Sequence, residues 1–220
     1  MTRRELCAGL LVPGFELSDD GQMLVLDRFD MVAHGNGRIE RLGFEDIAAL
    51  AGLRVRDVLS DRKYQGSYQR VAELLRQLQL PGSNLHRFFA QVAFSVMVRN
   101  GDAHLKNFGV LYRSAADIWL APMYDVVTTS IYPYTRYPGG PALEDRTLAL
   151  KLFAGRHHTR TYPTRAELLQ FGRRVCGVSQ PAQVLQAIAQ ERGSETFLVP
   201  TMLKRLVEHP RFGEFDTRSL

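Results

Sequence analysis

A strongly apolar segment followed at once by a polar one is the feature that most constrains how this chain can fold. Residues 85–98 include Phe88 and Phe89 and are apolar on almost every side of a helix, which predicts a helix at the centre of the fold. Residues 99–108 then read Arg-Asn-Gly-Asp-Ala-His-Leu-Lys-Asn-Phe. Polar groups are costly to bury without partners, so we expect this segment to line a cleft.

The remaining pattern predicts an α+β fold in which helices dominate. Phe44 and Ile47 begin a helical spacing after Gly43, and Thr164 stands three residues before Glu167, as in a capping box. The expected elements are the end of a helix over residues 1–8, a β-hairpin over residues 9–29, a helix from Gly43, an amphipathic helix over residues 67–80, the central helix capped by Asn84, a hairpin over residues 108–120, and helices after Thr164, with Pro181 and Pro200 each opening one.

The composition is that of an ordinary globular protein. The chain has 220 residues, of which 45% are hydrophobic and 23% charged, and a net charge of +5 permits an anionic partner such as ATP, nucleic acid or an acidic protein surface. No apolar run approaches the roughly 20 residues that span a bilayer. Two cysteines cannot form a disulfide framework. We therefore expect a cytoplasmic protein without a membrane segment.

The spacing within the polar segment points to phosphoryl transfer. Asp102 and Asn107 stand in the relation Asp-x-x-x-x-Asn, the register of a protein-kinase catalytic loop, where Asp orients the attacking hydroxyl or accepts its proton and Asn binds Mg²⁺. Asp125 follows after a predicted hairpin, and the oxygen ligands of Asn107 and Asp125 suit Mg²⁺ on ATP phosphates. His104 or Lys106 could stabilise negative charge on the transferred group.

Two other functions are open at this point. Asp102, His104 and Asp125 could instead bind the metal of a hydrolase or nuclease, because an Asp-x-His pair on a loop can ligate a metal ion. The chain could also be an inactive binding module for another protein or nucleic acid. The usual kinase signatures His-Arg-Asp, Asp-Phe-Gly and Ala-Pro-Glu are absent from the sequence.

Residues 100–108, Asn-Gly-Asp-Ala-His-Leu-Lys-Asn-Phe, followed by residues 121–127, Ala-Pro-Met-Tyr-Asp-Val-Val, resemble the HipA kinases. These are the toxins of bacterial type II toxin–antitoxin modules. The resemblance runs from residue 5 to about residue 208, and residues 25–30, 63–64 and 147–151 also agree. It implies a kinase-like fold, with residues 1–30 as a β-hairpin remnant of the N-lobe and hinge and residues 31–220 as the helical C-terminal lobe.

The resemblance also implies roles for particular residues. Asp102 would be the catalytic aspartate, and Asp125 would be the principal Mg²⁺ ligand, with Asn107 as the second. The expected nucleotide-binding residues are Asp27, Arg28, Phe29, His104, Lys106, Asn107 and Tyr124. Among these, residues 27–29 would form the hinge that meets the adenine.

As a HipA-type protein, the chain would be a serine/threonine kinase that uses ATP and Mg²⁺. The family implies a protein substrate, with aminoacyl-tRNA synthetases as known targets. It also implies a HipB-like helix-turn-helix antitoxin, through which DNA would be bound indirectly. Family members carry a Gly-rich phosphate loop and a Lys ahead of the matching region, and no Lys precedes Lys63 here. We therefore expect the isolated chain to bind Mg²⁺–ATP weakly and to show little or no kinase activity.

Overall fold

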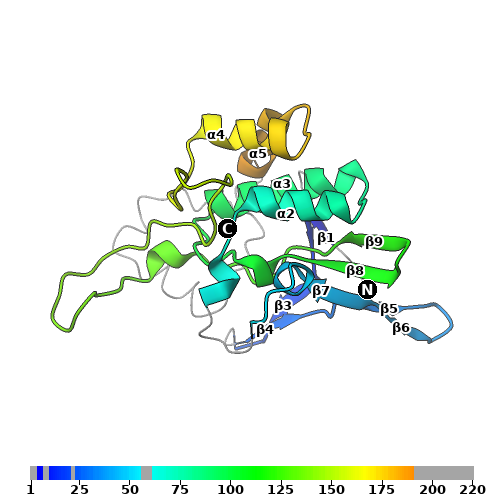
Figure 1. The fold of residues 1–220 in the computed structure, drawn as a ribbon. Helices are drawn as coiled ribbons and strands as arrows, with labels where there is room; N and C mark the ends of the chain where they lie inside the picture. The colour runs from blue at the N-terminus through cyan, green and yellow to red at the C-terminus, as the bar shows by residue number, and fades with distance from the viewer. Residues whose placement is uncertain (1–3, 7–9, 21–22, 56–60, 191–220) are drawn as a thin grey trace.

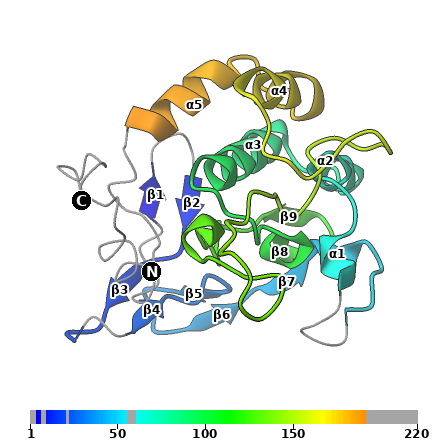
Figure 2. The same cartoon turned by 90° about the vertical axis from the view of Figure 1, so that its left-hand side faces the viewer.

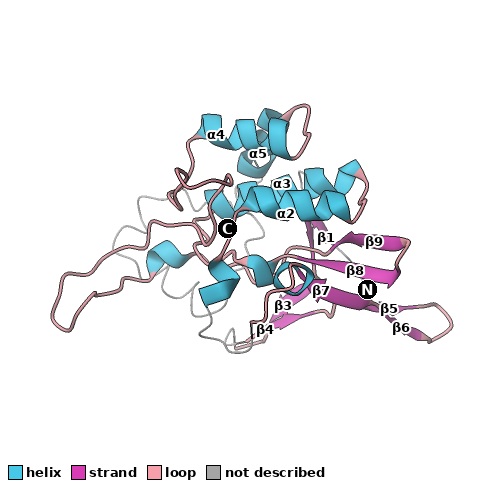
Figure 3. Ribbon diagram, in the orientation of Figure 1, coloured by secondary structure: helices cyan, strands magenta, loops and turns pink. Residues whose placement is uncertain are grey.

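The computed structural model describes residues 4–6, 10–20, 23–55 and 61–190. Most of the helices gather on one side of the molecule, and most of the small antiparallel sheets lie on the other (Figure 1, Figure 3). The predicted α+β class is therefore confirmed. No helix among these residues has the length and apolar character needed to cross a lipid bilayer. Pro200, predicted to open a helix, lies outside the described residues, and the division of the chain at residue 30 stays a prediction.

In the described part of the chain, the strands form three separate hairpins and one larger sheet, all antiparallel. The hairpins pair β1 (Arg4–Leu6) with β2 (Leu10–Val12), β3 (Phe15–Leu17) with β4 (Leu24–Leu26), and β5 (Met31–Ala33) with β6 (Ile39–Arg41). The larger sheet has the order β7 (Gly43–Asp46), β8 (Gly109–Ser114), β9 (Asp117–Leu120). The predicted hairpins over residues 9–29 and 108–120 therefore both form.

The helices include two long elements in the middle of the chain and a second group after residue 164. They are α1 (Ile47–Leu50), α2 (Tyr68–Gln77), α3 (Gly82–Met97), α4 (Arg165–Gln170), which continues into a π-helical turn over Phe171–Val175, and α5 (Pro181–Gln190). Thr164 and Glu167 form the predicted capping box at the start of α4, and Pro181 opens α5 as expected.

Helix α3 lies at the centre of the core. It contacts α2, α5, β2 and β9, and Figure 2 shows it enclosed between the other helices and the sheet. Most of its side chains are buried, as the apolar sequence predicts. Phe88 is fully buried, and its ring lies 5.4 Å from that of Phe108 and 6.5 Å from that of Phe171.

Two buried side-chain amides on α3 hold the chain where it leaves β9. The Asn84 Oδ1 atom accepts a hydrogen bond from the Leu120 amide at 2.9 Å, and Gln91 Nε2 donates to the Ala121 carbonyl at 3.0 Å. The prediction that Asn84 caps the helix is therefore wrong. The helix begins earlier, after Pro81, and the Asn84 side chain satisfies a buried backbone N–H on another element instead.

Two further element predictions are corrected. Arg4–Leu6, expected to end a helix, is strand β1 and pairs with β2. The helix expected from Gly43 begins only at Ile47, with Asp46 as its N-cap, because β7 pairs with β8 over the preceding four residues. Pairing along β8 satisfies backbone groups that would otherwise form an open sheet edge, and it outweighs the helical spacing of the apolar residues.

Truncating the centre of the core should cost much of the folding stability. We expect Phe88→Ala to lower the free energy of unfolding by about 3–5 kcal/mol, because it removes a fully buried ring and leaves a cavity. Urea denaturation followed by circular dichroism measures the change. Met97→Ala on the same helix is the control, since Met97 is 42% exposed and should change stability little. A loss below about 1 kcal/mol for Phe88→Ala would contradict the central position of α3.

Candidate active site

The polar segment begins where α3 ends in a Schellman motif. The Arg99 amide donates to Val96 O at 3.3 Å and the Asn100 amide to Ser95 O at 2.8 Å. Arg99 adopts a left-handed conformation with φ 53°, which is the usual way to end a helix. The chain turns sharply at this point, and Asn100 is buried directly below the loop that follows.

Short polar contacts then fix the position of Asp102. The Asn100 Oδ1 atom accepts a hydrogen bond from the Asp102 amide, and the Gly101 amide donates to Thr129 Oγ1, both at 3.0 Å. A Cβ atom on Gly101 would lie 2.8 Å from the Thr147 carbonyl oxygen, so only glycine fits without a shift of the backbone. The Asp102 side chain emerges from this turn 38% exposed.

His104 is buried beneath the same loop, with 6% of its surface exposed. Its amide donates to Asp102 O at 2.7 Å, and its Nε2 atom lies 3.9 Å from Asp102 Oδ1. Burial lowers the pKa of the imidazole below its usual value, and the Asp102 carboxylate offsets only part of this effect. We therefore expect His104 to be neutral and to pack beneath the loop, without supplying positive charge to a phosphate.

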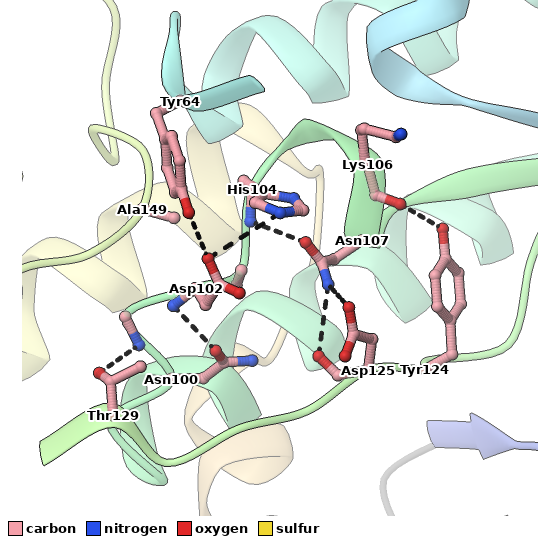
Figure 4. A network of polar contacts seen from close by, with 12 residues as sticks. Tyr64, Asn100, Asp102, His104, Lys106, Asn107, Tyr124, Asp125, Thr129 and Ala149 are labelled. Atoms are coloured by element: carbon pink, nitrogen blue, oxygen red, sulfur yellow. Dashed lines mark hydrogen bonds and ion pairs between the residues drawn. The ribbon is translucent and has the colours of Figure 1, made fainter. Parts of the chain in front are cut away.

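The predicted metal ligands lie side by side. Asn107 Nδ2 donates to Asp125 Oδ2 at 2.6 Å and approaches Asp125 O at 3.4 Å, while Asn107 Oδ1 accepts a long hydrogen bond of 3.3 Å from the His104 amide (Figure 4). The β8–β9 hairpin thus returns the chain to the polar loop, as the sequence predicts. In the described part of the chain, neither Asp102 nor Asp125 forms an ion pair with Lys or Arg.

Asp125 has a backbone conformation that is uncommon for a residue with a side chain. Three described residues other than glycine have positive φ: Gln79, Arg99 and Asp125. The first two follow the ends of α2 and α3, where Schellman hydrogen bonds require it. Asp125, with φ 55°, follows no helix. Such a conformation costs about 1–3 kcal/mol and often marks a functional site.

The Asn107–Asp125 pair has the chemistry and spacing to hold Mg²⁺. Adjacent oxygens of an octahedral Mg²⁺ site with bonds of 2.0–2.1 Å are about 2.9 Å apart, close to the 2.6 Å between the two side-chain ends here. The Asn107 side-chain amide now presents its nitrogen to Asp125, and a half-turn would present its oxygen there instead. The backbone amide of His104 would then lose its long bond to Asn107 Oδ1 but keep its shorter bond to Asp102 O. Few protein ligands suffice, because Mg²⁺ retains waters and binds phosphates.

An aromatic pocket of about 300 Å³ adjoins this pair and contains the predicted hinge. Its lining residues are Pro13, Leu26, Asp27, Arg28, Phe29, Asp30, Phe44 and Tyr124. The Phe29 and Tyr124 rings stack at 5.3 Å with an interplanar angle of 28°, and the Tyr124 hydroxyl donates to Lys106 O at 2.7 Å. The residues predicted as hinge and as catalytic loop are therefore joined through one tyrosine. The Arg28 guanidinium pairs with Asp30.

A second, more polar pocket of about 400 Å³ lies on the Asp102 side. It is lined by Asp61, Tyr64, Gly101, Asp102, Val127, Thr129, Asp145, Thr147, Leu148 and Arg160. The Tyr64 hydroxyl donates to Asp102 Oδ1 at 2.6 Å (Figure 4). Thr147 and Leu148 come from residues 147–151, one of the further segments that resemble the HipA kinases. Nothing in the spacing of the sequence indicated Tyr64, which lies 38 residues before its partner.

The structure brings most of the predicted site residues together, while their individual roles stay predictions. Asp102, His104, Asn107 and Asp125 form one connected group, and the hinge residues adjoin it through Tyr124. The Lys106 side chain is exposed and points away from Asn107 and Asp125 (Figure 4). In the described part of the chain, no three or more His, Cys, Asp or Glu side chains are placed to hold a metal ion.

Comparison with known proteins places this site in a family. Residues 4–196 match the sequence model of the HipA-like C-terminal domain. The chain belongs to this family. A solved structure of Shewanella oneidensis HipA, in a complex with HipB and operator DNA, superimposes with a TM-score of 0.58 and 18% identity over 96% of this chain and 48% of that chain. The kinase-like fold of HipA is therefore the fold of this chain.

Curated relatives of this HipA-like chain carry names that describe kinases. "Putative kinase Y4dM" of Sinorhizobium fredii is 32% identical over 113 residues, which are 51% of this chain and 25% of that protein. "Putative kinase Y4mE" of the same organism is 30% identical over 115 residues, 50% of this chain and 26% of that protein. The matched segments thus span about a quarter of these relatives.

The buried His104 should make stability depend on pH. Because the folded pKa is lowered, the unfolded chain binds a proton on His104 first as the pH falls. The contribution of neutral His104 to the free energy of unfolding is complete above about pH 6.5 and is lost as the pH falls through the folded pKa. We expect His104→Gln to flatten the loss of stability between about pH 7 and pH 5, by up to about 1.4 kcal/mol per pH unit.

Urea denaturation at several pH values measures this slope. His157→Gln is the matched control, because His157 is exposed and its replacement should leave the slope unchanged. An equal pH dependence in wild type and His104→Gln would show that His104 is not the group that titrates.

Proposed function

We propose that this chain is the catalytic region of a HipA-like serine/threonine protein kinase that transfers the γ-phosphoryl group of ATP to a protein hydroxyl. The observation that carries the proposal is the pair of carboxylates, Asp102 and Asp125, without Lys or Arg partners in the described part of the chain. Asp102 lines the polar pocket, and Asp125 directly follows Tyr124, which lines the aromatic one. Negative charge left unbalanced in this way suits a divalent cation on a triphosphate.

The aromatic pocket would take the nucleotide base. Phe29 and Tyr124 offer stacked rings next to the hinge at Asp27 and Arg28, and Phe44 closes the pocket edge-on at 5.6 Å from Phe29. Asp125 and Asn107 would hold Mg²⁺, which neutralises charge on the phosphates when bound. Lys106 points away from this position in the structure, and His104 is neutral, so we assign charge neutralisation mainly to the metal.

Asp102 would act on the acceptor. An acceptor hydroxyl in the polar pocket donates its hydrogen bond to the Asp102 carboxylate, and its oxygen attacks the γ-phosphorus. The bond between that phosphorus and the β–γ bridging oxygen breaks, and ADP leaves with the bridging oxygen. The hydroxyl proton passes to Asp102. Because such transfer depends mostly on positioning and charge, the rigid turn around Asp102 supports this role.

The wider biology follows from the family. We propose a cytoplasmic toxin that is held by a HipB-like antitoxin and meets DNA only through it, with an aminoacyl-tRNA synthetase as the class of substrate. The Shewanella oneidensis HipA structure contains HipB and operator DNA. Growth of cells that express the chain would separate an enzyme from a binding module. Arrest that Asp102→Ala abolishes indicates phosphoryl transfer, whereas arrest that persists in this variant indicates binding alone.

Two matched substitutions separate metal binding from chemistry. We expect Asp125→Asn to weaken Mg²⁺–ATP binding at least tenfold, because it removes the charged ligand. We expect Asp102→Asn to leave that affinity within about twofold and to lower ADP formation by about 10²-fold or more, because it removes the proton acceptor. Isothermal titration calorimetry, with EDTA as the metal-free control, gives the affinities.

A parallel assay with radiolabelled ATP gives the rates of ADP formation and autophosphorylation for the same proteins. Equal Mg²⁺–ATP affinity in wild type and Asp125→Asn would contradict the assigned metal site. Micromolar affinity together with clear autophosphorylation would contradict the expectation that the isolated chain is weak. Unchanged ADP formation in Asp102→Asn would remove Asp102 from the mechanism.

A further inference from the structure

Tyr64 makes the closest side-chain contact to the carboxylate of Asp102. Its hydroxyl lies 2.6 Å from Asp102 Oδ1, within the range of a charge-assisted O–H···O⁻ bond. Burial and the Asp102 carboxylate both raise the pKa of the Tyr64 phenol. The phenol therefore keeps its proton at neutral pH and can donate a hydrogen bond to the Asp102 carboxylate. Figure 4 shows the ring directed at Asp102 from the side opposite Asn107 and Asp125.

The surroundings of Tyr64 hold its ring in place. The residue ends a short 3₁₀ helix over Asp61–Tyr64, and its ring packs edge-on against buried His104 at a centroid distance of 5.2 Å. The Lys63 ammonium lies 5.1 Å from the ring centroid. A half-buried aromatic ring fixed on two sides can impose a direction on the group that it contacts, at little entropic cost.

The other oxygen of Asp102 remains open. In the described part of the chain no protein group donates a hydrogen bond to Oδ2, and the side chain keeps 38% exposure toward the polar pocket. The terminal torsion of an aspartate is broad and nearly two-fold. Without a partner on Oδ1, the carboxylate would sample orientations in which neither oxygen faces an acceptor hydroxyl.

We propose that Tyr64 is a positioning residue for phosphoryl transfer: its hydroxyl holds Asp102 Oδ1 so that Oδ2 faces the acceptor hydroxyl. The inference rests on the proposed kinase function and names the group that orients its catalytic carboxylate. Tyr64 lines the polar pocket and not the aromatic one. Its hydroxyl therefore serves the transfer step and leaves nucleotide binding to Phe29, Tyr124 and Asp125.

The test replaces Tyr64 by Phe, which removes the hydroxyl and keeps the ring that packs on His104. We expect kcat for ADP formation to fall about tenfold, because misplacement of a reacting group lowers the rate steeply. The KM and calorimetric Kd for Mg²⁺–ATP should stay within twofold. Incorporation of 4-aminophenylalanine at position 64, which restores an N–H donor, should recover most of the lost kcat. Tyr137→Phe, at a residue 61% exposed, should change none of these values.

A second measurement needs no nucleotide. Tyr64→Phe, Asp102→Ala and the double variant are compared by their urea midpoints, since alanine leaves no side-chain oxygen to accept from Tyr64. The hydrogen bond predicts that the two single shifts are not additive. Additive shifts would overturn the inference while leaving the kinase proposal intact.

The kinetic outcomes are separable in the same way. An unchanged kcat in Tyr64→Phe, or a fall in kcat that is matched by the loss of Mg²⁺–ATP affinity and is not recovered by 4-aminophenylalanine, would overturn the positioning role alone. A wild-type chain that does not bind Mg²⁺–ATP at all would overturn the kinase proposal, and the inference with it, before any Tyr64 variant is measured.

Discussion

The enclosure of helix α3 is the constraint on which the other parts of the structure depend. A helix that is apolar on nearly every side must be surrounded, and here α2, α5 and the sheet surround it. Its few buried polar groups then need partners. Asn84 and Gln91 find them on the backbone of Leu120 and Ala121, so the packing of the helix also fixes the segment that leads to Asp125. The Schellman turn at its other end starts the loop that carries Asp102.

Both carboxylates of the site are held by neutral donors. The phenol of Tyr64 contacts Asp102, and the amide of Asn107 contacts Asp125. A Lys or Arg in either place would form a salt bridge and compete with a bound cation, whereas a neutral donor orients the oxygen and leaves its charge in place. The site thus keeps its negative charge, and a half-turn of the Asn107 amide would place its oxygen beside Asp125 for a magnesium–nucleotide complex.

Residue order predicted the centre of the site better than its surroundings. The apolar helix, the Asp-x-x-x-x-Asn loop and the hairpin before Asp125 are consecutive, so their arrangement follows from local structure. Tyr64 and Thr147 reach the site only through tertiary packing, and no periodicity reveals such contacts. The predictions that proved wrong, the helix after Gly43 and the cap at Asn84, also failed because of tertiary contacts. The residues after Gly43 have helical spacing, but the need to pair β8 makes them a strand, and a buried N–H on β9 draws Asn84 away from capping.

The left-handed backbone at Asp125 also decides which substitutions there are interpretable. Aspartate and asparagine tolerate this region better than most side chains, so the exchange of one for the other changes charge with little effect on the main chain. Alanine would remove the ligand and raise the conformational cost together, by about 1 kcal/mol or more. A systematic replacement by alanine would therefore overstate the contribution of the carboxylate at this one position.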